Sequence, residues 1–159
     1  MTSPTFSLGR GFTLTRTFAA PPSLVFAAWT QPEHLGWFFN PGHRSDKAVT
    51  VDLRVGGAWR QEMIVDDETR YMTGGIFSAI EPDKKLVFTW GAVDGWPKID
   101  PDNLDLSPQV SITLSRVSGG TQMIFSLQLP DQLTEPQTAE WMSSQMLAGW
   151  TMTLDRLEF

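Results

Sequence analysis

Side chains that could perform chemistry are sparse in this sequence and form no familiar catalytic or metal-binding pattern. The chain has two histidines, His34 and His43, and no cysteine. Their separation within a turn region does not fit the spacing of zinc ligands, and no serine lies in a nucleophile elbow. His34 is expected on a helix surface, whereas His43 follows Pro41-Gly42 in a loop at the rim of any cavity. We therefore expect no metal, no cofactor and no catalytic residues.

The predicted third strand has two chemically different faces. Trp59, Gln61 and Met63 share one face, and Arg60 and Glu62 share the other. The more apolar face is expected to point inward, where Gln61 would offer a hydrogen bond that orients a ligand. In the reverse phase Arg60 and Glu62 would be buried, and they would then become functional candidates because a buried charge must be paired or used.

Residues 91–109 form the one long connection in the predicted arrangement. Structureless connections of more than ~12–15 residues often serve as lids or binding loops. Trp96 is expected to lie in such a lid over the mouth of a cavity. The acidic stretch from Asp100 to Asp105 lacks the glycine and the final glutamate of a calcium loop, so no calcium site is expected.

Composition and charge limit the possible partners. The 159 residues suit a single domain over residues 10–159, preceded by a loose N-terminus over residues 1–9. There are 12 Lys and Arg against 18 Asp and Glu, a net charge of −6, so neither nucleic acid nor a membrane is expected as a partner. The longest apolar run, Leu24 to Trp29, is too short to span a bilayer, and no secretory signal is visible. A cytoplasmic protein is the resulting expectation.

Hydrophobic periodicity predicts a strand, two short helices, six strands and a long C-terminal helix. The first strand covers residues 10–18, and the short helices follow Pro22 and Glu33. Six later strands are separated by short turns, which favours antiparallel pairing; they are expected at residues 49–53, 58–65, 71–80, 85–90, 110–116 and 121–129. Thr134 and Gln137 match a capping box, so the last helix is expected to begin there and to continue for ~22 residues.

A twisted antiparallel sheet of six to seven strands must curl around one long helix and leave a space between them. Either side chains or a ligand fill that space, and large aromatic residues and methionines suit both. The candidate cavity residues are Trp37, Phe39, His43, Trp59, Gln61, Met63, Phe77, Phe88, Trp90, Trp96, Phe125, Met142, Met146 and Trp150.

Several short motifs occur in an order and spacing that resemble one known family. They are Phe18–Pro22 with Val25-Phe26, Thr30–Leu35, Trp37-Phe38 before Pro41-Gly42, Gly56–Arg60, Gly74-Gly75, Ile80–Pro82, Leu86–Trp90 and Gly149–Thr151. Together they resemble the proteins similar to the C-terminal domain of the activator of the heat-shock-protein-90 ATPase, a family of the START-like (SRPBCC) superfamily, and the resemblance covers residues 10–159. It implies an α+β helix-grip (START-like, Bet v-like) fold, in which a curved antiparallel sheet wraps around a C-terminal helix and encloses a deep apolar cavity.

The resemblance implies a fold more strongly than a function, because superfamily members include lipid and hormone binders, polyketide cyclases, resistance proteins and co-chaperone domains. We expect non-catalytic binding of an apolar small molecule, such as a lipid, a polyketide or an aromatic metabolite. A cyclase or hydrolase is the alternative, and it needs an ionisable group such as His43, Glu62, Arg60 or Asp94 inside the cavity. A stress-response or chaperone-interacting module is a third reading. A chaperone partner is not expected, because the additional N-terminal domain of the eukaryotic co-chaperone is missing. A homodimer remains open.

Overall fold

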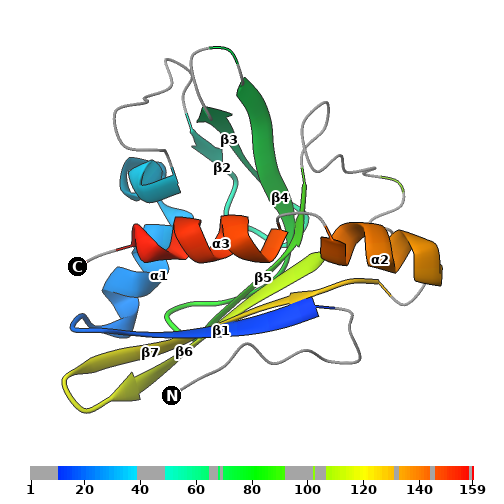
Figure 1. The fold of residues 1–159 in the computed structure, drawn as a ribbon. Coiled ribbons are helices and arrows are strands. Elements are labelled where there is room, and N and C mark those ends of the chain that lie inside the picture. Colours follow the sequence, from blue (N-terminus) through cyan, green and yellow to red (C-terminus); the bar gives the residue numbers. More distant parts are fainter. Residues whose placement is uncertain are drawn as a thin grey trace.

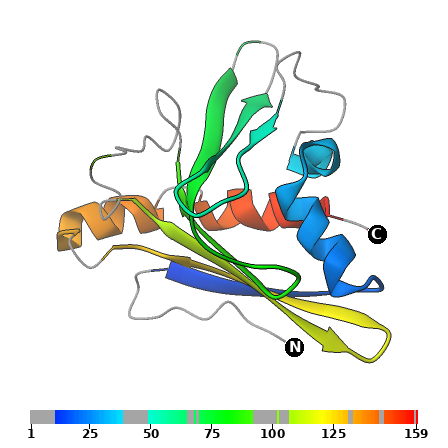
Figure 2. The same ribbon diagram turned by 180° about the vertical axis from the view of Figure 1, so that it is seen from behind.

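The computed structural model describes residues 11–38, 49–64, 68, 70–91, 102, 107–130, 133–143, 146–157 and 159. Within them, seven strands form one antiparallel sheet, and the C-terminal helices lie across one of its faces (Figure 1). The strands β2, β3 and β4 rise steeply away from β1, β6 and β7, so the sheet is strongly curved (Figures 1 and 2). This is the helix-grip arrangement that the sequence resemblance implies.

The predicted strands are confirmed. They are β1 (Gly11–Phe18), β2 (Thr50–Val51), β3 (Ala58–Ile64), β4 (Arg70–Glu81), β5 (Lys85–Trp90), β6 (Gln109–Val117) and β7 (Gly120–Gln128). β2 is shorter than predicted because the chain turns after it: the Arg54 N–H donates to the Asp52 carbonyl, and the Gly57 N–H donates to the Arg54 carbonyl, both at 2.8 Å. Each strand from β2 to β7 pairs with the next one along the chain, and the connections are short except that from β5 to β6, which spans residues 91–108.

The first strand does not follow that sequential order. The sheet runs β1-β7-β6-β5-β4-β3-β2, so β1 pairs with the last strand, and Leu14 lies opposite Phe125. Of the two helices that follow β1, α1 (Pro22–Thr30) contacts β6 and β7, whereas the 3-10 helix η1 (Pro32–Phe38) contacts α1 and α3 (Met146–Asp155). The pairing of β1 with β7 brings residues from the two ends of the chain into one core.

Proline and hydroxyl chemistry set where the helices begin. α1 (Pro22–Thr30) has proline at its first position, where the missing N–H costs no hydrogen bond, and the 3-10 helix η1 (Pro32–Phe38) begins in the same way. Before α2 (Glu135–Ser143), the predicted capping box is present: Gln137 Oε1 accepts from the Thr134 N–H at 2.9 Å, and Thr134 Oγ1 accepts from the Gln137 N–H at 3.3 Å.

The C-terminal helical segment is described as two helices, α2 and α3 (Met146–Asp155), and residues 144 and 145 between them lie outside the described residues. Figures 1 and 2 show α3 across the face of the sheet, with α1 near one of its ends and α2 beyond the other. Gly149 is exposed, and a Cβ atom there would meet no atom within 4 Å, so no close approach of α3 to the described residues requires this glycine. None of the described helices has the length and apolarity to cross a membrane.

Candidate functional site

The inward face of the sheet is covered by aromatic rings that touch one another. Six of the predicted cavity residues belong to one buried core: Trp59, Phe77, Phe88, Trp90, Phe125 and Trp150. The ring centroids of Phe125 and Trp150 are 4.8 Å apart, and those of Trp90 and Trp150 are 5.2 Å apart. The ring centroid of Phe88 lies 5.5 Å from that of Trp59 and 6.4 Å from that of Phe77. These separations lie within the range for contacting rings, so each of the six side chains packs against another ring. Their role in lining a ligand cavity stays a prediction.

Two side chains of α2 border the core but are less buried than its rings. Trp150 is 4% exposed and Trp90 is 6% exposed. Trp141 and Met142, on α2, are only partly buried although they pack against the same core, and the ring of Trp141 lies 6.4 Å from that of Trp90. The aromatic interior therefore reaches a partly open edge beside α2.

Gln61 is a polar side chain on the same face of β3 as Trp59, as the strand pattern predicts, and it is fully buried. Its Oε1 accepts from Trp59 Nε1 at 3.2 Å, and its Nε2 donates to the Leu35 carbonyl at 2.9 Å. The amide thus ties β3 to η1. A glutamine amide has two N–H groups and two oxygen lone pairs, so one of each has no partner among the described residues.

We expect Gln61→Leu to lower the free energy of unfolding by about 2–4 kcal/mol, because the buried Trp59 N–H and Leu35 carbonyl would both lose a partner. Chemical denaturation measures the change. Gln128→Leu makes the same replacement at an exposed strand end and should change stability by about 0.5 kcal/mol at most. Equal effects of the two substitutions would contradict the tie between β3 and η1.

The charged face of β3 differs from the prediction at one position. Arg60 is exposed as expected, but Glu62, expected to be exposed as well, is only 5% exposed. Its Oε1 lies 4.0 Å from Nη1 of the half-exposed Arg70 on β4. The alternation rule assigns a face to a side chain but does not say what covers that face, and here Glu62 is buried on the side opposite Gln61. Glu62 is the only ionisable side chain among the buried polar residues that the structure describes.

The other predicted residues are described in part or not at all. Trp37, Met63 and Met146 lie in η1, β3 and α3, and their side chains lie outside the described part of the structure. Phe39, His43, Asp94 and Trp96 also lie outside it. His34 is exposed at the surface of η1, as predicted. No cluster of metal-ligating side chains occurs among the described residues.

The structure adds two tryptophans that the pattern did not assign to the interior lining. Trp29 of α1 stacks 6.2 Å from Phe125 and donates its Nε1–H to Met123 Sδ at 3.3 Å. Trp141 precedes the predicted Met142 by one residue and also faces the core. No apolar residue lies three or four positions before Trp141 in α2, so helical spacing gave no signal for it.

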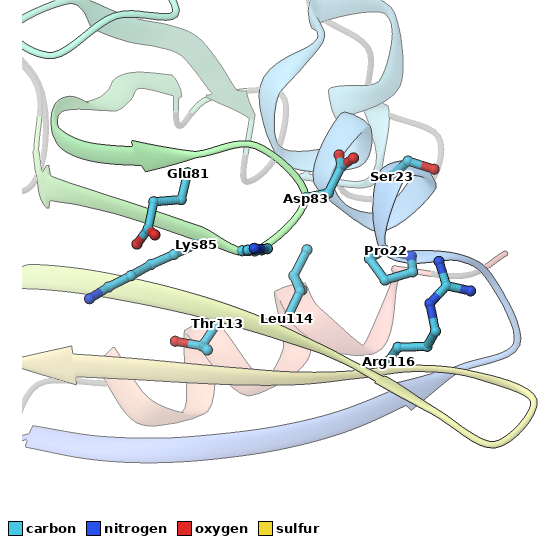
Figure 3. Close-up of a pocket in the computed structure, with 9 residues that line it drawn as sticks. Pro22, Ser23, Glu81, Asp83, Lys85, Thr113, Leu114 and Arg116 are labelled. Atoms are coloured by element: carbon cyan, nitrogen blue, oxygen red, sulfur yellow. The ribbon is translucent and has the colours of Figure 1, made fainter.

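Two surface pockets formed by described residues lie away from this interior. One of about 530 Å³ lies between the start of α1, the turn from β4 to β5, and β6 (Figure 3). The other, of about 330 Å³, lies beside the turn from β6 to β7, and Arg116 borders both.

Comparison with known proteins identifies the type of domain. Residues 19–158 match the family model described as Activator of Hsp90 ATPase homolog 1-like protein. No curated protein matches the chain.

Solved structures share this fold at low sequence identity. A protein from Rhodobacter sphaeroides is 20% identical, with 98% of this chain and 95% of that chain covered and a TM-score of 0.75. Protein Ms6760 from Mycobacterium smegmatis is 20% identical, with 98% and 93% covered and a TM-score of 0.75. Protein NE0264 from Nitrosomonas europaea is 25% identical, with 95% and 93% covered and a TM-score of 0.72. These similarities show the fold.

Proposed function

The chain belongs to the Activator of Hsp90 ATPase homolog 1-like family, and on that premise we propose that it binds an apolar small molecule between the curved sheet and α2 and α3. The chemical class is a lipid, a polyketide or an aromatic metabolite. The observation that supports this proposal best is the partly open edge formed by Trp141 and Met142 next to the buried Trp90. Aromatic and thioether side chains at an accessible edge suit a hydrophobic ligand of variable shape.

The polar arrangement also favours binding over catalysis. General acid–base catalysis needs an ionisable group that faces the substrate. Among the described residues, Glu62 is the buried ionisable side chain, and it lies on the face of β3 opposite Gln61. Gln61, which is neutral, has one N–H and one lone pair without a partner among the described residues, and these could orient a ligand without transferring a proton.

Tryptophan fluorescence tests the proposal during titration with a panel of lipids, flavonoids and polyketides, and native mass spectrometry reports binding independently. For a ligand that binds, we expect Met142→Ala to weaken affinity about tenfold, the loss of roughly 1.4 kcal/mol of apolar contact. Met152→Ala is the matched control, because Met152 on α3 is 60% exposed.

Two results would count against this function. One is a panel in which no compound changes the fluorescence or adds mass to the protein. The other is an equal loss of affinity in Met142→Ala and Met152→Ala, which would place binding away from the edge beside α2.

A further inference from the structure

The larger surface pocket combines side chains from three separate elements. Pro22 and Ser23 come from the start of α1, Lys84 and Lys85 from the turn between β4 and β5 and the start of β5, and Arg116 from β6. Figure 3 shows Arg116 near Pro22 at one end of the view and Lys85 near the other end. Its volume of about 530 Å³ lies within the range of small-molecule sites.

Cationic side chains are concentrated in this pocket although the protein is acidic. Three of its nine lining residues, Lys84, Lys85 and Arg116, are cationic, whereas the whole chain of 159 residues has 12 Lys and Arg. None of these three side chains forms an ion pair with a described residue. The pocket therefore offers N–H donors of the kind that bind phosphate, and no described carboxylate pairs with them.

The start of α1 adds to the same positive field. Pro21 precedes the helix without a side-chain cap, and the first turn contains no acidic residue. The partial positive charge of a helix N-terminus is normally offset by such groups. An anion bound beside Pro22 and Ser23 would supply that compensation.

The remaining lining residues limit what the anion is attached to. Glu81 and Asp83 repel phosphate, but their carboxylates accept hydrogen bonds from hydroxyl groups, as acidic residues do from ribose. The buried Pro22 and Leu114 supply a small apolar floor. The lining contains no aromatic side chain on which a nucleobase could stack.

We propose that this pocket binds a phosphorylated sugar of monosaccharide size, with the phosphate on Arg116 beside the start of α1 and the sugar hydroxyls on Glu81, Asp83 and Lys85. The site lies outside the interior assigned to an apolar ligand, so either proposal can fail without the other.

Isothermal titration calorimetry at low ionic strength tests this assignment with ribose 5-phosphate and glucose 6-phosphate as ligands. Inorganic phosphate, free glucose and adenosine monophosphate serve as comparisons. We expect both sugar phosphates to bind more tightly than each of these three comparison ligands.

Variants locate the two halves of the ligand. Arg116→Gln and Lys85→Gln should each weaken sugar phosphate binding about tenfold, the effect of one charge-assisted hydrogen bond. Arg60→Gln is the matched control, because it removes the same charge from an exposed residue outside the pocket. Asp83→Asn should weaken the sugar phosphates and spare inorganic phosphate, and asparagine tolerates the positive φ of 63° at this position.

The proposal is overturned if sugar phosphates do not bind or bind no better than inorganic phosphate. It is also overturned if Arg60→Gln weakens binding as much as Arg116→Gln does, since the attraction would then be a property of the whole surface. If Asp83→Asn bound the sugar phosphates as tightly as the unmodified protein does, the proposal that Asp83 binds a sugar hydroxyl would be wrong.

Discussion

Phe125→Ala is expected to lower the free energy of unfolding by about 3–5 kcal/mol, the usual cost of truncating a fully buried phenylalanine. Phe125 lies on β7, and its ring centroid is 4.8 Å from that of Trp150 and 6.2 Å from those of Phe12 and Trp29. One side chain therefore joins β1, β7, α1 and α3. Urea denaturation with an unchanged m-value would measure the loss.

The control for Phe125→Ala is Phe159→Ala, the same substitution at the last residue of the chain. Phe159 is 46% exposed and makes an edge contact with Phe18 at 5.1 Å, so Phe159→Ala should cost about 1 kcal/mol or less. If the space between the sheet and the helix were hollow around Phe125, truncating this side chain would remove fewer packing contacts. A loss in Phe125→Ala close to that in Phe159→Ala would then show that this part of the interior is not densely packed.

Gly74→Ala is expected to destabilise the protein by about 3 kcal/mol or more, because the new methyl group would overlap the backbone of the neighbouring strand. Gly74 lies on β4 opposite Arg60 of β3, and a Cβ atom there would collide with the carbonyl oxygen of Trp59. Relief requires the two strands to move apart at the point where β3 presents Trp59 and Gln61 to the interior. A lower midpoint of thermal and chemical unfolding would measure the effect.

Gly149→Ala gives the opposite expectation for the same substitution. Gly149 lies inside α3, and a Cβ atom added there would meet no neighbour within 4 Å. Alanine should therefore raise stability by about 0.5–1 kcal/mol through its higher helix propensity. If Gly74→Ala and Gly149→Ala changed stability by similar amounts, the close approach of β3 and β4 at Gly74 would be refuted.

Much of the fold follows from short stretches of sequence. Alternating side chains mark β6 and β7, the reciprocal capping pair of Thr134 and Gln137 marks the start of α2, and Pro22 marks the start of α1. These signals can be recognised without the structure because each depends on residues within one turn of helix or one strand pair. The inward position of Trp59 and Gln61 follows from the same alternation.

The candidate site was predictable only in part. The pattern identified Phe125, Trp150 and the other buried rings as interior residues, but it could not say which of them pack against each other and which border an accessible edge. It did not include Trp29 among the candidate cavity residues, although the ring of Trp29 reaches Phe125 from a helix almost one hundred positions earlier in the chain. It also placed Glu62 at the surface, since the side chains that cover a strand face come from other elements.

The local sequence determines whether an element is a helix or a strand and which side of a strand is apolar, because backbone geometry repeats every 3.6 or two residues. Capping residues and prolines determine where the helices begin. Contacts between distant segments arise only from folding: β1 beside β7, Gln61 bonded to the Leu35 carbonyl, and Lys85 and Arg116 around one pocket with Pro22. They depend on strand register and sheet twist, which place residues from across the whole chain together and leave no repeating trace in the sequence.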